Sequence, residues 1–110
     1  MKHRMKLVDF AFNAIKNKEK DIELRLNDEK RKLVNIGDII IFTNLETNEE
    51  LEVVVTNLYK YSTFEELFAN FDHKRFGLKD TDTSFTMDDF YSKEDQKKYG
   101  ALGIEIKLLK

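Results

Sequence analysis

In the stretch Lys18-Glu19-Lys20-Asp21-Ile22-Glu23-Leu24-Arg25-Leu26, polar and apolar residues alternate strictly from residue 21 onward. A β-strand points successive side chains to opposite faces. Ile22, Leu24 and Leu26 should therefore face a core, while Asp21, Glu23 and Arg25 share the other face. Lys20 lies at the start of this strand, close enough to join them. The polar face is either a binding site or a strand face exposed to solvent.

The composition predicts one globular domain, residues 1–110, that is large enough for a single core. The chain has no cysteine, which excludes disulfides, thiolate chemistry and zinc–sulfur sites. Its apolar runs are too short for a membrane span, and its start does not resemble a signal peptide. We therefore expect a cytoplasmic protein that has no contact with the membrane.

Charge is distributed unevenly along the chain. Residues 1–35 contain ten Lys and Arg against six Asp and Glu, whereas residues 36–110 contain nine against fifteen. The first third is thus positively charged although the net charge is −2, and the small net charge argues against strong non-specific binding to nucleic acid. This asymmetry permits a basic patch near the first strands, and scattered surface charge would explain it equally well.

The remaining patterns predict an α+β domain. The apolar run Ile39–Phe42 indicates a strand buried on both faces, and Asn48 should take a positive φ in the hairpin that follows. We expect a curved, mainly antiparallel sheet or small barrel of five or six strands, bent by β-bulges, with three short helices. The predicted strands are residues 3–7, 21–26, 39–42, 51–58 and 104–108.

Local signals define the ends of the predicted helices. Asp9 should cap the first helix, whose apolar stripe comprises Phe10, Ala11, Ala14 and Ile15, and Asn17 should end it in the left-handed conformation. Ser62 and Glu65 fit a capping box for the second helix. The third should begin after Ser92 and end at Gly100.

Several kinds of site are excluded by the motifs that the chain lacks. It has no HExxH, no Gly-rich phosphate loop and no GxSxG elbow. His3 and His73 are far apart. Residues 80–84 resemble the start of a calcium loop, but Phe85 replaces the required Gly and Tyr91 the required Glu. We predict neither a metal site nor any other cofactor.

Lys20, Glu23 and Arg25 remain as candidates. Arg25 can bind a carboxylate, a phosphate or a base edge in a planar, bidentate way. Glu23 can accept a hydrogen bond from an exocyclic amine. A desolvated Lys20 beside Glu23 could act as a base or nucleophile. On these residues alone, a structural surface pair is the commoner outcome.

Residues 15–25 resemble the GxKxxExR signature of the ASCH (activating signal cointegrator homology) domains, which share the PUA-like pseudo-barrel fold of RNA-binding modules. Lys20, Glu23 and Arg25 match the K, E and R, and Lys18 stands where the signature has Gly. Residues 36–44 and 91–104 resemble the family as well. The likeness covers nearly the whole chain and is strongest to small bacterial single-domain members.

The resemblance implies a cleft for RNA or a nucleotide-like or nucleoside-like ligand. In a binding module, Lys20 and Arg25 would contact phosphate or base edges and Glu23 would read an amino group. Three further residues would close the cleft, and a tyrosine among them could stack on a base. These are Tyr91, Ser92 and Tyr99.

An alternative is a small amidohydrolase. Some small members that resemble this chain remove the acetyl group from N4-acetylcytidine with the motif Lys, a Thr at the position of Glu23 and a Glu from later in the chain. Here Lys20 would be the base or nucleophile, and Glu23 would orient the substrate or shuttle a proton. The later Glu could correspond to Glu65, Glu66 or Glu94. A third possibility is a protein-interaction domain whose motif residues brace the first helix.

The proposed site carries a geometric condition. Strict alternation places Lys20 on the apolar side with Ile22. Lys20 can therefore reach Glu23 only if the backbone turns or bulges before the strand begins.

Overall fold

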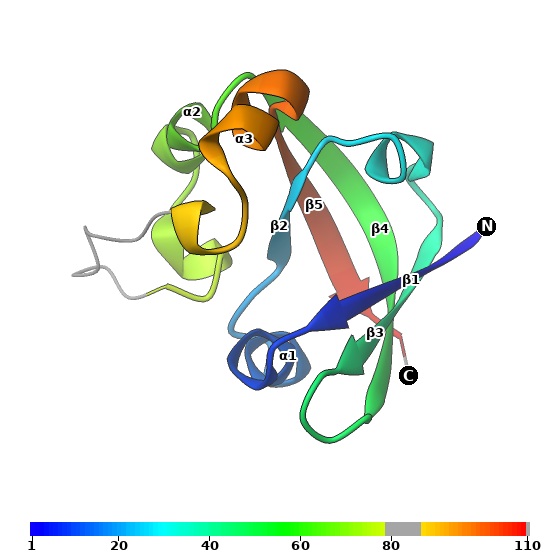
Figure 1. The fold of residues 1–110 in the computed structure, drawn as a ribbon. Coiled ribbons are helices and arrows are strands. Elements are labelled where there is room, and N and C mark those ends of the chain that lie inside the picture. The colour runs from blue at the N-terminus through cyan, green and yellow to red at the C-terminus, as the bar shows by residue number, and fades with distance from the viewer. Residues whose placement is uncertain (79–86, 110) are drawn as a thin grey trace.

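Ile22–Leu26 forms strand β2 at one edge of a five-stranded sheet in the computed structural model, which describes residues 1–78 and 87–109. The strand order is β1-β3-β4-β5-β2, with β1 parallel to β3 and all other pairs antiparallel. The sheet curls into half a barrel (Figure 1), which confirms the predicted α+β class and the curved, mainly antiparallel sheet. The other strands are β1 (Lys2–Leu7), β3 (Ile39–Asn44), β4 (Glu50–Tyr61) and β5 (Ala101–Leu108).

Three α-helices accompany the sheet. α1 (Asp9–Lys16) connects β1 to β2, while α2 (Phe64–Ala69) and α3 (Lys93–Tyr99) lie together at the opposite end of the molecule (Figure 1). Short 3₁₀ turns occur at η1 (Arg31–Leu33), η2 (His73–Arg75) and η3 (Met87–Asp89). No helix within these described residues is long and apolar enough to cross a membrane.

Two apolar clusters form the core. The larger packs Phe12 and Ile15 of α1 against β1, β3, β4 and β5, and the smaller joins Ile22 and Leu24 of β2 to Leu67 of α2. Residues 40–42 of β3 are all buried, as predicted for a strand covered on both faces. Burying side chains of this size contributes about 1.5–3 kcal/mol each.

The long strand β4 bends the sheet. It pairs with β3 near one end and with β5 along most of its length, and its register with β5 shifts between Val55 and Asn57. Such a bulge increases the local twist. The predicted bending by bulges is thereby confirmed, and so is the positive φ of Asn48, at 63°.

Local predictions at the first helix are wrong in two respects. Asp9 is the first helical residue rather than the cap, and its carboxylate accepts hydrogen bonds from the side chains of Asn13 (3.1 Å) and Asn44 (2.9 Å). Phe10 is 71% exposed and does not belong to the apolar stripe, whereas Phe12 is fully buried. The helix is therefore rotated relative to the predicted stripe.

The capping box of α2 is displaced by one residue. Thr63, not Ser62, caps the helix, and its hydroxyl accepts a hydrogen bond from the backbone N–H of Glu66, not Glu65 (3.1 Å). Phe64 then becomes the first helical residue and is buried.

Candidate functional site

The turn between α1 and β2 prepares the site. Asn17 keeps an ordinary φ of −88°, and Lys18 takes the left-handed conformation instead, with φ 63°. The prediction for Asn17 is thus wrong by one residue, and Lys18 occupies the position of the signature Gly. The next two amides, of Glu19 and Lys20, both donate to the carbonyl of Ala14 (2.8 and 3.1 Å). The chain therefore reverses immediately after the helix.

Lys20 fulfils the geometric condition because this reversal precedes the strand. Its Nζ lies 2.8 Å from Oε1 of Glu23, and β2 begins only at Ile22. The backbone of Lys20 forms an isolated bridge with Phe76, and Gly77 covers its side chain. A Cβ added to Gly77 would lie 3.3 Å from the Lys20 Cβ, at a φ of +81°. Only glycine allows this segment to lie so close to the lysine stem.

Lys20, Glu23 and Arg25 form a row of paired side chains, which Glu23 and Arg25 continue toward the opposite edge of the sheet. Oε2 of Glu23 lies 2.7 Å from Nε of Arg25, and Nη2 of Arg25 donates to the carbonyl of Lys6 (2.8 Å). Lys6 belongs to β1 and Arg25 to β2, which are the two opposite edges of the sheet. We call the line between these unpaired edges the seam. Arg25 thus connects both sides of the seam.

The row is buried. The side chains of Lys20, Glu23 and Arg25 are 9%, 4% and 11% exposed, so the expectation of a solvated strand face is wrong. Burial raises the pKa of Glu23, but the charges of Lys20 and Arg25 more than reverse this, and the net pKa is lowered. Burial likewise lowers the pKa of Arg25, and Glu23 reverses it to a net rise. The row therefore contains an ionised carboxylate between two cations at neutral pH.

These side chains line a cavity of about 230 Å³ at the seam. Tyr91 also lines it; its ring lies parallel to that of Phe64 with centroids 6.2 Å apart, and burial raises the pKa of its hydroxyl. Small-molecule sites usually measure about 300–1,000 Å³, so this cavity has room for one small flat group rather than a whole nucleotide. Apolar residues provide most of the remaining wall: Leu7, Val8, Phe10, Ala11, Leu24, Leu45, Phe76, Met87 and Phe90.

Two predicted ligand residues do not line the cavity. The hydroxyl of Ser92 caps α3 by accepting from the backbone N–H of Asp95 (3.1 Å), and Tyr99 packs against the smaller apolar cluster. The structure therefore brings together Lys20, Glu23, Arg25 and Tyr91. Sequence reasoning missed the apolar wall, for which the sequence contains no distinguishing signal.

The glutamates considered for a hydrolase lie elsewhere. Glu65 and Glu66 are exposed on α2, Glu94 is exposed on α3, and none of them lines the cavity. The residues that resemble a calcium loop, 80–85, lie outside the described part of the chain. Within that part, no cluster of three or more His, Cys, Asp or Glu could hold a metal ion.

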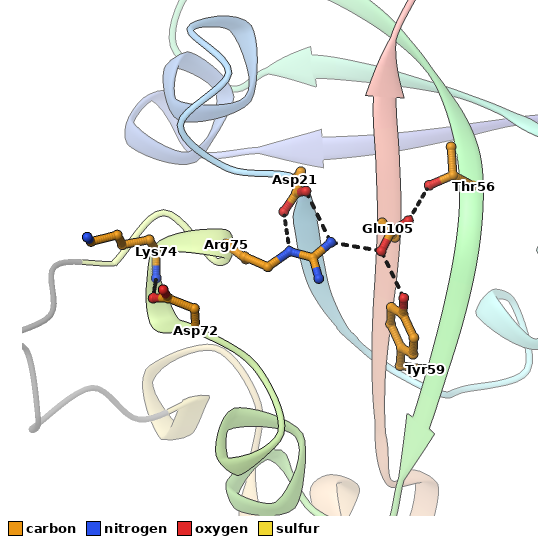
Figure 2. A network of polar contacts seen from close by, with 7 residues as sticks. All are labelled: Asp21, Thr56, Tyr59, Asp72, Lys74, Arg75 and Glu105. Atoms are coloured by element: carbon orange, nitrogen blue, oxygen red, sulfur yellow. Dashed lines mark hydrogen bonds and ion pairs between the residues drawn. The ribbon is translucent and has the colours of Figure 1, made fainter.

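Asp21 does not share the face of Glu23 and Arg25, contrary to the alternation pattern. It binds both Nε and Nη2 of Arg75, at 3.0 and 3.1 Å, and Arg75 also contacts Glu105 at 2.8 Å (Figure 2). Glu105 in turn accepts from the hydroxyls of Tyr59 and Thr56. The Arg75 carbonyl accepts from the amide of Asp21 (3.0 Å). This network fixes the segment that places Phe76 and Gly77 over Lys20.

The curled five-stranded sheet with its short helices is that of a PUA-like domain. The family model of the ASCH domain matches residues 5–110, and the chain belongs to this family. Among curated proteins, none matches the chain.

Three solved structures are similar over most of the chain. The crystal structure of hypothetical protein PH0355 is 34% identical, with a TM-score of 0.82, over 99% of this chain and 100% of that one. The solution NMR structure of protein PF0455 from Pyrococcus furiosus is 32% identical, with a TM-score of 0.75, over 100% and 99%. The S128A mutant of ZmASCH from Zymomonas mobilis is 13% identical, with a TM-score of 0.62, over 94% and 66%, and shows the shared fold alone.

Proposed function

We propose that this ASCH domain is an RNA- or nucleotide-binding module that holds one nucleobase in the cavity at the seam. ASCH domains as a family are suggested to bind RNA. The observation that carries the proposal is the buried row of Lys20, Glu23 and Arg25 on the wall of a small cavity.

Stability alone gives little reason to bury this row. Desolvating charged groups costs several kcal/mol per ion, and well-packed apolar residues often replace a buried ion pair with no loss of stability. A binding site has a use for the same groups, because Arg25 and Lys20 donate hydrogen bonds and Glu23 accepts them. A base edge offers matching acceptors and exocyclic amines.

The shape and the wall of the cavity also favour a base. A nucleobase has apolar faces and a polar edge, and the cavity combines apolar residues with the charged row. Tyr91 is the candidate to stack on it, and stacking of this kind is worth about 1–3 kcal/mol per base. The cavity volume leaves the sugar and phosphate outside, and the exposed Lys6, which also lines the cavity, is the candidate to contact the phosphate.

Binding of single-stranded RNA to wild type and Arg25→Ala, at low and moderate salt, tests the proposal. We expect Arg25→Ala to weaken binding at least about tenfold, because charge-assisted hydrogen bonds contribute about 1.5–3 kcal/mol. Arg25→Lys keeps the charge and removes the planar fork, so it should also weaken binding while perturbing the fold less. Arg4→Ala is the matched control, since Arg4 is 66% exposed and pairs with Glu50 outside the cavity.

Circular dichroism and thermal unfolding of each variant separate a binding defect from unfolding. The proposal is wrong if wild type binds no RNA at either salt concentration. It is equally wrong if folded Arg25 variants bind as tightly as wild type.

A hydrolase acting on a modified nucleoside is the second candidate. The contact between Lys20 Nζ and Glu23 within the cavity favours it. It ranks second because both Glu23 oxygens are paired and its pKa is lowered, which makes it a poor general base at neutral pH. Loss of the acetyl group from N4-acetylcytidine is the assay. A rate that Lys20→Ala leaves unchanged would exclude Lys20 from the reaction.

A bracing role is the third candidate, and the bond from Arg25 to the Lys6 carbonyl across the seam favours it. A protein-interaction domain braced in this way would lose stability in Glu23→Ala and would show no ligand in a nucleotide screen. RNA binding that depends on Arg25 in folded protein would contradict this view.

A further inference from the structure

Phe10 lies on the wall of two neighbouring hollows. It lines the cavity at the seam, and it also lines an open groove of about 1040 Å³ between α1 and the segment that follows η2. Asn13 and Ala14 of α1, Lys18 in the left-handed turn, and Gly77 contribute to the same groove. The residue that the two hollows share is therefore an aromatic side chain that is 71% exposed.

The exposure of Phe10 belongs to a wider pattern. Single exposed apolar residues are ordinary on protein surfaces. In the described part of the chain, however, four of the eight exposed large apolar residues line the cavity. We call these four the apolar rim: Val8, Phe10, Leu45 and Phe90. The rings of Phe10 and Phe90 provide flat surfaces on which bases can stack beside the charged row, and Val8 and Leu45 add apolar surface.

The groove adds charge beside this rim. Lys18 is exposed and makes no ion pair with any residue that the structure describes. Lys74 and Arg75 also line the groove, together with Glu19 and Asp21, and Asp21 is neutralised by Arg75. Arg75 also pairs with Glu105 at 2.8 Å, so its charge is already balanced by two carboxylates. Lys18 is the cation of this groove that stands nearest in sequence to the motif.

We propose that the groove binds the nucleotide next to the one whose base occupies the cavity. The ring of Phe10 stacks on the second base, and Lys18 contacts its phosphate. The ligand is then a single strand of at least two nucleotides rather than a free nucleoside. This inference rests on the proposed function, because it takes the cavity as the site of the first base.

A protein partner fits the groove less well. The centres of protein–protein interfaces are depleted in charged residues, whereas five of the ten residues that line this groove are charged. Single-stranded nucleic acid sites combine cationic grooves with exposed aromatic rings, and each stacked base contributes through its face regardless of sequence.

Two variants test the subsite on the folded, full-length protein. Phe10→Ala should weaken binding of a short single-stranded RNA of mixed sequence by roughly 5- to 150-fold. Because Phe10 also lines the cavity, the affinity for nucleoside monophosphates, followed by NMR shifts that detect millimolar binding, should fall by a smaller factor, and an equal fall would overturn the subsite. Lys18→Ala should leave this affinity unchanged, since Lys18 lines the groove and not the cavity. Lys18→Ala should reduce the slope of log affinity against log salt for the RNA by about 0.7, the value for one phosphate contact on a single strand.

Matched controls are available on other surfaces. Leu33 is 61% exposed and lines neither hollow, so Leu33→Ala controls for loss of an exposed apolar side chain. Lys97 is exposed on α3, far from α1 (Figure 1), and Lys97→Ala controls for loss of charge. Both should bind RNA as wild type does.

The outcomes separate the two proposals. If wild type binds neither mononucleotides nor RNA, the proposed function fails and the subsite fails with it. If wild type binds both and Phe10→Ala leaves RNA affinity unchanged, only the subsite is overturned. Equal losses in Phe10→Ala and Leu33→Ala would also overturn it. The subsite is also overturned if wild type self-associates and Phe10→Ala makes it monomeric without affecting RNA binding.

Discussion

Replacing Lys18 by Gly should stabilise the protein. Lys18 has a φ of 63°, and a residue with a Cβ pays roughly 1–2 kcal/mol in the left-handed region. Glycine avoids this cost but loses more conformational freedom on folding, by about 0.5–1 kcal/mol. Lys18→Gly should therefore raise the free energy of unfolding by about 1 kcal/mol. In a domain of this size, this raises the melting temperature by about 4 °C or slightly more.

The comparison is cleanest between Lys18→Gly and Lys18→Ala, because both remove the charge and only one relieves the backbone. The same pair of substitutions at the preceding residue is the control. Asn17 has a φ of −88°, where alanine is unstrained, so Asn17→Gly should be less stable than Asn17→Ala by about 0.5–1 kcal/mol. The sign of the glycine effect should therefore reverse between adjacent positions.

Urea unfolding of the four variants gives their free energies of unfolding, fitted with one common dependence on urea concentration. If Lys18→Gly is no more stable than Lys18→Ala, the left-handed turn before β2 is refuted. If glycine stabilises both positions, the effect does not come from φ. A positive result would also show that the domain forms the signature turn without the signature glycine.

Further predictions concern the row, a buried carboxylate and a helix cap. Glu23→Ala should lower the free energy of unfolding by about 3–5 kcal/mol, because it leaves two buried cations without their partner. The control Glu50→Ala removes an exposed pair with Arg4 and should cost at most about 1 kcal/mol in the same urea experiment. A hydrogen bond from His3 holds the pKa of the Asp38 carboxyl at about 2, below its usual 3.8. A carboxyl whose pKa is lowered by folding stabilises the folded state above its unfolded pKa, so wild type should lose stability as the pH falls from about 4 to about 2. Asp38→Asn should lack this part of the pH profile. Thr63→Ala should cost about 1 kcal/mol and Ser62→Ala much less, since Thr63 alone caps α2; equal losses would contradict the cap seen here.

The sequence predicted the strands correctly but placed a helix cap and a left-handed turn one residue too early, because local chemistry does not decide between the neighbouring residues. Ser62 and Thr63 are both good caps, and each has a glutamate three residues later, so local chemistry does not distinguish them. Tertiary packing does, because a start after Thr63 places Phe64 in the core. Asn17 has the higher intrinsic tendency to be left-handed, yet the turn occurs at Lys18, where it brings Lys20 beside Phe76.

The site shows the same dependence on distant residues. The motif spacing and the family resemblance were enough to select Lys20, Glu23 and Arg25. Alternation within β2 could not reveal that Glu23 is buried, because Phe76 and Met87, which line the cavity with it, lie more than fifty residues away.

Lys20 and Asp21 are adjacent but have different partners: Lys20 pairs with Glu23, and Asp21 pairs with Arg75. Arg75 binds Asp21 through its side chain and its carbonyl, and the next two residues, Phe76 and Gly77, cover Lys20. The position of the Lys20 amine against Glu23 thus depends on an arginine that the motif does not contain. The motif residues alone therefore do not hold Lys20 in place.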